Sequence, residues 1–263
     1  MTANIRVGIG GWAYEGWRGS FYPDKWPRAR ELEYASRRMT AIEVNGTFYS
    51  RFKPETFAGW ARTAPDGFVF ALKASRYCVT RRRLAEAGES VQRFLDQGIV
   101  ELGDKLGPIL WQLGETRRFD PDDIRAFLGL LPARHGGVGL RHAIQARHES
   151  FRSPEFVAMA RAAGVALVFA NSAKHPATAD LSGDFVYARL ENGVAEEPAG
   201  YAPAALDRWA DMSRRWADGA SPEGLPYTAD PALKRARDVF LFFINGAKER
   251  APHGAMALIE RLA

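Results

Sequence analysis

Residues 41–49 have the sequence AIEVNGTFY, in which apolar Ile42 and Val44 alternate with polar Glu43 and Asn45. Successive side chains of a β-strand point to opposite sides, so the alternation predicts a strand with one apolar and one polar face. The apolar face would pack beneath helices. What the polar face points into depends on the other strands of the chain.

Seven further segments have strand-like patterns, and segments with helical spacing separate most of them. The predicted strands are residues 5–11, 41–45, 68–73, 107–113, 140–147, 165–171, 185–191 and 239–245. The predicted helices are residues 28–39, 54–61, 90–106, 120–131, 153–163, 204–217 and 254–262. Only a short, poorly patterned stretch lies between the sixth and seventh strands.

This alternation predicts parallel strands joined by helical crossovers. Eight such units favour a closed barrel over an open sheet, and no glycine-rich nucleotide-binding pattern follows the first strand. No long polar linker divides the chain. We therefore predict an α/β fold, a single TIM-type (β/α)8 barrel over residues 1–263, with the helix after strand 6 abbreviated.

Two of the predicted helices begin with a capping residue followed by proline. Asp120 precedes Pro121, and Ser153 precedes Pro154. Asp and Ser side chains accept hydrogen bonds from the first free backbone N–H groups, and proline suits the first helical position. Both helices are therefore expected to start at their prolines.

The composition limits the class of protein. A hydrophobic content of 46% predicts a globular chain, and no apolar run approaches the roughly 20 residues of a membrane helix. The N-terminus has no export pattern, and a single cysteine, Cys78, excludes an internal disulfide, so a cytoplasmic location without membrane contact is expected. The formal charge of +5 suits an anionic small molecule or a nucleic acid.

Polar side chains gather near the C-terminal ends of the predicted strands. They are Glu43, Asn45, Lys73, Gln112, Gln145, Arg147, Tyr187, Arg189, Glu191 and Asn245. In a barrel these ends meet at one mouth, where active sites lie. An internal network, such as Glu43 with Lys73 or Arg147, would satisfy the same groups without a ligand, and this alternative stays open.

The charges of this set predict a site for an anion. Lys73, Arg147 and Arg189 outnumber Glu43 and Glu191 by one, and arginine and lysine bind phosphate or carboxylate groups. Glu43 is then the predicted general acid or base, and Lys73 and His148 are the other predicted catalytic residues. The residues of the set that are predicted to bind the substrate are Asn45, Gln112, Gln145, Arg147, Tyr187, Arg189 and Asn245.

Aromatic residues are dense in the loop after the first strand. Between residues 12 and 26 the loop contains Trp12, Tyr14, Trp17, Phe21, Tyr22 and Trp26. These rings could line a ligand cleft, but packing of the loop onto its scaffold explains them equally well. Trp12, Tyr14 and Tyr49 are included among the predicted substrate-binding residues.

Six parts of the chain resemble the YecE-like family, domain of unknown function 72. They are GWAY (11–14) with FYP (21–23), EVNGTFY (43–49), FALKASRY (70–77), GPILWQ (107–112), RHESF (147–151) and YAR (187–189). The resemblance covers nearly the whole chain in order. It implies a TIM-type barrel and implies no established reaction.

Two positions depart from the family pattern. Gln145 stands where the family usually has glutamate, and Gly246 stands where the last strand is usually followed by a second asparagine. The first change removes a carboxylate. A glycosidase that works with paired carboxylates is therefore less attractive, and Glu43 becomes the acid that the chain can least replace. Glu43→Gln is expected to keep the fold and abolish activity.

Other chemistries have weaker support in the sequence. No metal or other cofactor is predicted, because of five histidines only His148 lies clearly at a strand end. A Schiff base through Lys73 is conceivable. The main competing prediction is binding of nucleic acid through the basic residues Arg76, Arg81, Arg82 and Arg83 and the loop aromatics. A non-catalytic scaffold is a third alternative, and oligomeric state stays open.

Overall fold

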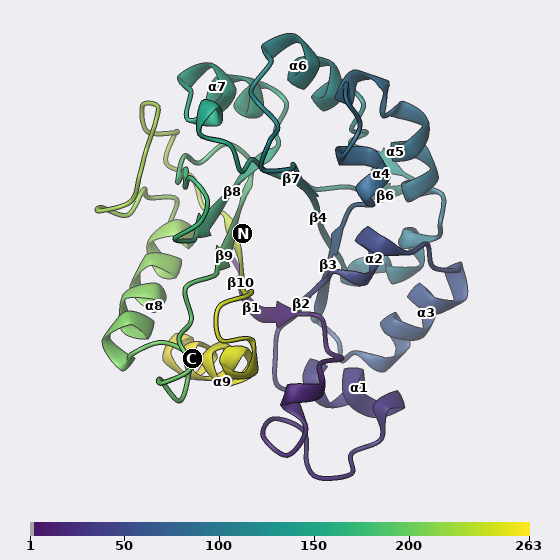
Figure 1. Cartoon of the computed structure of the whole chain (residues 1–263), viewed down its shortest axis with the longest axis vertical. Coiled ribbons are helices and arrows are strands. Elements are labelled where there is room, and N and C mark those ends of the chain that lie inside the picture. The colour runs from purple at the N-terminus through teal and green to yellow at the C-terminus, as the bar shows by residue number, and fades with distance from the viewer. Residues whose placement is uncertain (1–2) are drawn as a thin grey trace.

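A computed structural model describes residues 3–263, which contain a closed barrel of parallel strands (Figure 1). The strands follow the order β1-β10-β9-β8-β7-β4-β3-β2 around the barrel. Their bounds are β1 Ile5–Gly10, β2 Ala41–Val44, β3 Val69–Lys73, β4 Leu106–Gln112, β7 His142–Gln145, β8 Ala166–Asn171, β9 Phe185–Leu190 and β10 Asp238–Phe243. The predicted TIM-type barrel is confirmed. A small antiparallel pair, β5 (Arg134–His135) and β6 (Val138–Gly139), lies outside it.

Helices surround the barrel (Figure 1). The longer ones are α1 Glu31–Ser36, α3 Pro54–Thr63, α5 Gly88–Leu95, α6 Pro121–Gly129, α7 Pro154–Ala162, α8 Pro203–Ala217 and α9 Ala251–Leu262. Single turns form α2 (Gly46–Tyr49) and α4 (Arg76–Val79), and the 3-10 helices are η1 Glu15–Trp17, η2 Arg28–Arg30, η3 Leu84–Glu86, η4 Ile99–Lys105, η5 Glu149–Phe151 and η6 Lys248–Arg250. Between β8 and β9 the chain forms no helix, as predicted.

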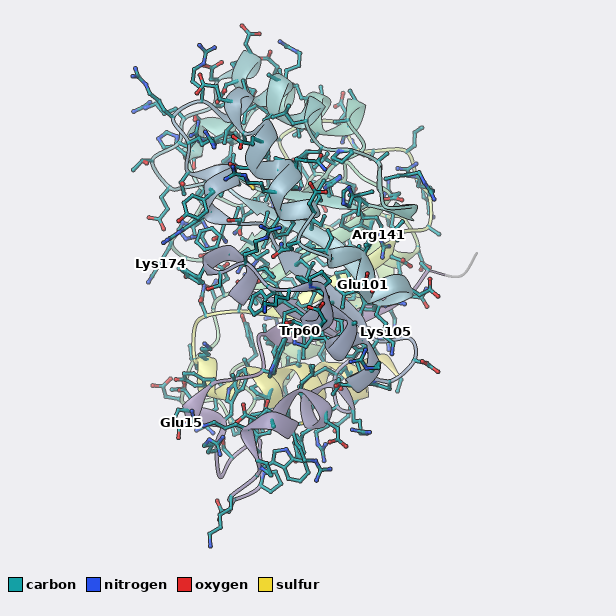
Figure 2. The ribbon with its side chains drawn as sticks, turned by 90° about the vertical axis from the view of Figure 1, so that its right-hand side faces the viewer. Glu15, Trp60, Glu101, Lys105, Arg141 and Lys174 are labelled. Carbon is teal, nitrogen blue, oxygen red and sulfur yellow. The ribbon has the colours of Figure 1, made fainter. Side chains whose placement is uncertain are left out.

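The two ends of the barrel can be followed in Figure 2. Lys174 follows β8, and Arg141 precedes β7, and they lie on opposite sides of the molecule in this view (Figure 2). The C-terminal ends of the strands therefore face the side of Lys174. No helix within residues 3–263 has the length and apolar character that crossing a bilayer requires.

The alternation in β2 has the predicted consequence. Ile42 and Val44 belong to the large apolar layer between the strands and the helices. A second, smaller apolar cluster, which includes Leu110, Tyr187 and Phe240, fills the barrel interior. Glu43 points inward with no solvent exposure, so a carboxylate lies within the barrel and needs partners there.

The prediction of one helix over residues 90–106 was wrong. Helix α5 ends at Leu95, and η4 begins at Ile99, after Gly98 in a left-handed conformation with φ of 102°. A Cβ atom at Gly98 would lie 2.6 Å from the Cα atom of Pro54, the first residue of α3. The glycine both breaks the helix and allows this close approach. The helix predicted over residues 28–39 was also too long. The structure has η2 and then α1 there, and α1 ends at Ser36.

The barrel closes tightly where β1 meets β2. Gly8 is paired with Ala41, and a Cβ atom at Gly8 would lie 1.8 Å from the carbonyl oxygen of Ala41. No side chain fits there without moving a strand. Gly8 is therefore required by packing and not by backbone conformation, because its φ is not in the left-handed region.

Candidate active site

The Glu43 carboxylate is the centre of a buried network inside the barrel, near the C-terminal ends of the strands. Arg189 donates to both carboxylate oxygens, from Nε to Oε2 at 3.1 Å and from Nη2 to Oε1 at 3.1 Å. The Tyr187 hydroxyl donates to Oε2 at 2.7 Å. Tyr187 and Arg189 are two residues apart on β9, so they share the inward face of that strand. The result is a forked, charge-assisted pair supported by a third donor.

Arg189 extends this network to two further strands. Its Nη1 donates at 2.8 Å to Gln145 Oε1 and at 2.8 Å to Glu191 Oε1. Gln112 on β4 also donates to Gln145 Oε1, at 2.7 Å. The internal network that the sequence left open therefore exists, but its central cation is Arg189, and Glu43 hydrogen-bonds to neither Lys73 nor Arg147 within residues 3–263.

These contacts decide the charge states of the network. Burial would raise the pKa of Glu43, but the charge of Arg189 and the hydrogen bonds from Tyr187 and Arg189 hold the pKa below its ordinary value. Burial raises the pKa of Tyr187 well above its ordinary value. Glu43 is thus a permanent carboxylate and Tyr187 a permanent donor near neutral pH.

A cavity of about 710 Å³ lies at the C-terminal mouth of the barrel. Its lining includes Asn45, Lys73, Gln112, Arg147, Arg189 and Asn245, which the sequence predicted as site residues. Tyr49 also lines it and is 64% exposed. The structure therefore brings most of the predicted polar set to one concave surface. Glu43, Gln145 and Tyr187 lie beneath it within the network.

The pKa of Lys73, which lines the mouth cavity, departs strongly from the ordinary value of a lysine. Its side chain is buried, with Nζ 4.3 Å from the centroid of the Phe48 ring. Burial lowers the pKa of Lys73 to about 8, helped by the charges of Arg189 and Arg147 and opposed by that of Glu43. At pH 7 roughly one tenth of this lysine is therefore uncharged, far more than for an ordinary lysine, and proton uptake by an amine requires the uncharged form.

Arg147, on the wall of the mouth cavity, has carboxylates nearby but no hydrogen bond to one within residues 3–263. Its nearest carboxylates are those of Glu115 at 3.7 Å and Glu191 at 4.0 Å, which are beyond hydrogen-bond distance. Its buried Nε has no hydrogen-bond partner within residues 3–263, and neither has the buried Nε2 of Gln145. Burial and the charge of Arg189 lower the pKa of Arg147. Arg147 is thus a residue of the cavity wall whose buried Nε has no acceptor within residues 3–263.

Several residues near the mouth were not predicted from the sequence. Phe48, Glu115 and Lys248 line the cavity, and His175 Nε2 lies 3.6 Å from Glu115 Oε1. Burial, together with the charge of Arg147, lowers the pKa of His175. His175 lies in the helix-free segment after β8, which had no recognisable pattern. Its position just beyond a strand end was the one available signal.

Three predicted residues lie away from the mouth cavity. His148 lines a separate small cavity with Phe151, and its Nδ1 pairs with Ser150 Oγ at 2.9 Å. Trp12 packs against Trp60, with ring centroids 5.2 Å apart. Tyr14 lies under Lys248, whose Nζ is 4.5 Å from its ring centroid. The structure does not bring His148, Trp12 or Tyr14 to the cavity wall, because their side chains point into the packing around the strand ends.

The other aromatic residues of the loop after β1 are mainly packing residues. Trp17, Phe21 and Tyr22 are almost fully buried, and Trp17 Nε1 donates to the carbonyl oxygen of Lys248 at 2.8 Å. Their rings contact one another at centroid distances of 4.7 to 6.3 Å. Packing onto the scaffold accounts for Phe21 and Tyr22, whereas Trp17 both packs there and belongs to the lining of the mouth cavity.

The departure at Gly246 has a local cause. Gly246 has φ of 58°, and a Cβ atom there would lie 2.6 Å from the backbone nitrogen of Gly193. Asn245, which lines the mouth cavity, also has a positive φ of 59°. The chain therefore turns sharply at the end of β10, and the turn leaves no room for a second asparagine side chain.

Metal binding has no site in the described part of the chain. Within residues 3–263 no group of three or more His, Cys, Asp and Glu side chains is arranged to hold a metal ion. Cys78 is buried, and burial raises the pKa of its thiol to about 12, so it is a poor nucleophile.

Fold and site together define a TIM-type barrel with a charged, hydrogen-bonded cluster at its C-terminal mouth. The chain belongs to the family described as "Protein of unknown function DUF72", whose model matches residues 6–263. It is similar to the UPF0759 protein YecE of Escherichia coli, with 28% identity over 144 residues, which are 52% of this chain and 48% of YecE. The match therefore spans about half the length of that relative.

Solved structures of the same family share the fold. A DUF72 family protein from Thermotoga maritima superposes with a TM-score of 0.73 at 20% identity and covers 98% of this chain and 99% of its own. One from Enterococcus faecalis gives a TM-score of 0.72 at 15% identity, covering 98% of this chain and 95% of its own. At these identities the likeness concerns the fold alone.

Proposed function

We propose that the protein is an enzyme that binds a small phosphate- or carboxylate-bearing substrate in the mouth cavity. The observation that supports this most is the state of Arg147, a half-buried cation on the wall of a 710 Å³ cavity, whose buried Nε has no hydrogen-bond partner in residues 3–263. Buried donors are normally satisfied, and a charged donor especially so. An anionic oxygen of a ligand would satisfy it.

The charge balance of the mouth supports the same proposal. Arg189 uses both buried carboxylates, those of Glu43 and Glu191, so Lys73 and Arg147 have no acid hydrogen-bonded to them within residues 3–263. Two cations without a hydrogen-bonded carboxylate on one cavity wall attract an anion. Arg189 itself is not the proposed anion ligand, because each of its three side-chain nitrogens already donates to an acceptor.

The proton chemistry is assigned to Lys73. An amine with a pKa of about 8 takes up and releases protons near neutral pH. Glu43 was the first choice from the sequence, but it is enclosed by Arg189 and Tyr187, and its pKa is lowered. Its role in this proposal is to hold Arg189 in place and to set the potential around Lys73. Lys73 is then the catalytic base, and Glu43 is a positioning residue.

Thermal shift with a panel of phosphate and carboxylate metabolites, inorganic phosphate included, tests the binding step. At a hundredfold excess over Kd a ligand adds about 2.7 kcal/mol of stability, or roughly 5–10 °C in Tm. We expect such a shift for the parent and its loss in Arg147→Gln. Arg152→Gln is the matched control, because Arg152 is a surface arginine paired with Glu149.

The proposal fails if no anion stabilises the parent, or if Arg147→Gln responds as the parent does. The catalytic part is tested separately. Any activity found in a substrate screen should be lost in Lys73→Met, while anion binding, then dependent on Arg147, weakens without being lost. In the parent, kcat/KM should rise with pH through about 8 as Lys73 loses its proton. Full activity in Lys73→Met would remove Lys73 from the mechanism.

A further inference from the structure

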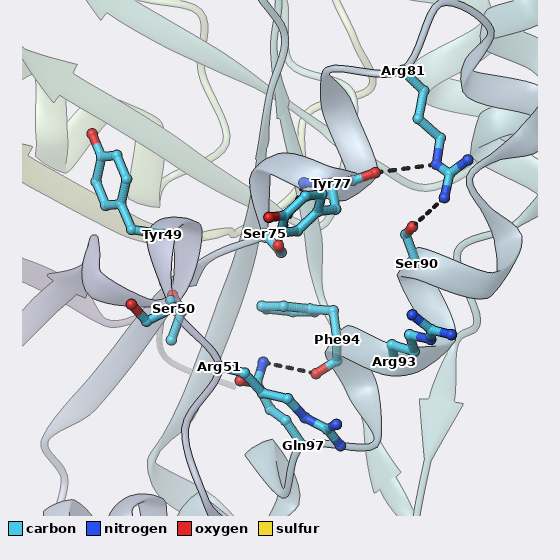
Figure 3. Close-up of a pocket in the computed structure, with 11 residues that line it drawn as sticks. Tyr49, Ser50, Arg51, Ser75, Tyr77, Arg81, Ser90, Arg93, Phe94 and Gln97 are labelled. Atoms are coloured by element: carbon cyan, nitrogen blue, oxygen red, sulfur yellow. Dashed lines mark hydrogen bonds between the residues drawn. The ribbon is translucent and has the colours of Figure 1, made fainter.

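A second cavity, of about 320 Å³, opens beside the mouth cavity (Figure 3). We call it the side cavity. It lies between α2 with the residues that follow it, the strand end and helix α4, and helix α5, and its lining includes Tyr49, Arg51, Tyr77, Arg81, Arg93 and Phe94. Tyr49 also lines the mouth cavity, so the two cavities are neighbours that share one wall.

Aromatic rings form much of the side cavity. Figure 3 shows Tyr77 and Phe94 lying one above the other across it, with Tyr49 on the far side. Phe94 is buried and fixed by Trp111, with ring centroids 5.9 Å apart. Tyr77 is 62% exposed, although the Arg76 guanidinium lies 5.3 Å from its ring centroid. An exposed ring opposite a buried one offers a stacking surface for a planar group.

The charged residues of the side cavity are all arginines. Arg51, Arg81 and Arg93 line it, and no acidic residue does. Arg93 pairs with Glu89 at 2.6 Å, whereas Arg51 and Arg81 have no ion pair within residues 3–263. Arg81 is held in place, because it donates to Ser90 Oγ at 2.8 Å and to the carbonyl oxygen of Tyr77 at 3.2 Å (Figure 3). The potential inside the cavity is therefore positive.

The floor of the side cavity is preformed. Gln97 is buried, accepts a hydrogen bond from the backbone N–H of Phe52 at 3.1 Å and donates to the carbonyl oxygen of Phe94 at 2.8 Å. This amide ties the segment after α2 to α5. The cavity walls therefore need little rearrangement to accept a ligand, which lowers the entropic cost of binding.

We infer that the side cavity binds a nucleotide unit, with the planar base against Tyr77 and Phe94 and the phosphate on Arg51 and Arg81. A ring system with an attached anion is the chemistry that stacking rings and unpaired arginines recognise together. The volume suits one nucleotide, and the bases of a duplex do not expose their ring faces. The unit is a free nucleotide or one nucleotide of a single strand. The inference goes beyond the anion site of the mouth and does not depend on catalysis there.

Calorimetric titration with each nucleoside monophosphate, and with a short single-stranded deoxythymidine oligomer, tests this inference. We expect binding by the parent that weakens about tenfold in Tyr77→Ala, because stacking of a base on an aromatic ring is lost. For the oligomer, Arg51→Gln should also reduce the salt dependence of binding by about one unit of slope. Tyr77 and Arg51 are exposed, so both variants should fold, which their Tm values check.

Arg82→Gln is the matched control, because Arg82 is an exposed arginine of the loop after α4 and lies outside the cavity lining. If a monophosphate binds more tightly, the ligand is a free nucleotide, and if the oligomer binds more tightly, it is a nucleotide of a single strand. Either result supports the inference. Absence of binding for all of these probes, or equal affinities in all variants, overturns it. Inorganic phosphate, which has no ring, is titrated in parallel, so a mouth that binds phosphate while no nucleotide binds overturns this inference alone.

Discussion

The buried ion pair of Glu43 and Arg189 shows how single residues determine this site. A charge without solvent exposure is expensive, and the cost is offset here because each charged atom meets a counter-charge or a hydrogen-bond partner. Removing one partner leaves the other uncompensated. We therefore expect Glu43 to matter for stability, which changes the expectation that Glu43→Gln keeps the fold undisturbed.

We predict that Glu43→Gln lowers the free energy of unfolding by about 3 kcal/mol, because Arg189 keeps its charge and loses its main counter-ion. Urea denaturation at pH 7 measures this. Because the folded-state pKa of Glu43 is lowered, its contribution is present at neutral pH and is lost as the pH falls into the acid range. The difference between parent and variant should therefore shrink at low pH.

Glu115→Gln is the control for this prediction. Glu115 also lies at the mouth but is 66% exposed at its side chain and is 3.7 Å from Arg147. Its substitution should change the unfolding free energy by less than about 0.5 kcal/mol. Equal effects of the two substitutions would mean that burial of the pair contributes nothing particular to stability.

Lys73 gives a prediction about pH. Its pKa should be about 8 and should rise in Arg147→Gln, because the charge of Arg147 is one of the causes that lower it. Nuclear magnetic resonance of ¹³C-methylated lysines measures the titration, and Arg152→Gln should leave it unchanged. A Lys73 signal that titrates at the ordinary value near 10.4 would contradict the prediction. Since the unfolded chain binds this proton more tightly, stability attributable to Lys73 should increase from pH 8 to about 10.5.

At the scale of single elements, the two helices that begin with a capping residue and proline differ in the structure. Asp120 accepts from the backbone N–H of Asp122 at 3.1 Å and of Asp123 at 3.2 Å, so it caps α6. Ser153 precedes α7 in the same way, yet its side chain makes no capping hydrogen bond. Both helices start at their prolines, as predicted. The same sequence pattern, however, gives a capping hydrogen bond in α6 and none in α7.

We predict that Asp120→Ala lowers the unfolding free energy by about 1 kcal/mol, because two helix N–H groups lose their acceptor. Ser153→Ala should change it by less than about 0.5 kcal/mol, because no such bond is lost. The two variants are compared by thermal or urea unfolding under one set of conditions. A larger loss in Ser153→Ala than in Asp120→Ala would show that the capping geometry described here is not the one that matters in solution.

At the scale of the whole molecule, closure of the barrel depends on the contact between its first two strands. Gly8 lies directly against the backbone of Ala41, where a Cβ atom would approach the carbonyl oxygen to 1.8 Å. Since β1 also pairs with β10, the last strand, a shift of β1 disturbs both of its neighbours. The position is thus one where a single methyl group affects the entire fold.

We predict that Gly8→Ala lowers the unfolding free energy by more than about 4 kcal/mol or prevents folding, since strand displacement in a packed core is among the most damaging changes. Gly129→Ala is the control, because its Cβ would meet no atom within 4 Å in helix α6. Alanine there should leave stability unchanged or raise it by up to about 1 kcal/mol. Circular dichroism and urea unfolding of both variants decide the matter, and wild-type stability of Gly8→Ala would contradict it.

The alternation of apolar and polar residues by itself determined the barrel, the position of most strands and the gathering of polar groups at one end, because these depend on the local period of the chain. Residues within strands, such as Lys73 and Gln112, could be placed at the mouth for this reason. His148 could not, because after a strand ends the period no longer tells which way a side chain points.

Only the tertiary structure decided which charges pair. Arg189 rather than Arg147 meets Glu43, because strand register and side-chain reach across the barrel set that choice, and neither is encoded in the spacing within one strand. The side cavity likewise required the fold, since Tyr49, Tyr77 and Phe94 come from three separate helices. For residues 41–49, the sequence determined that Glu43 points inward, and the fold determined that it meets Arg189 there, while Lys73 and Arg147 have no hydrogen-bonded carboxylate within residues 3–263.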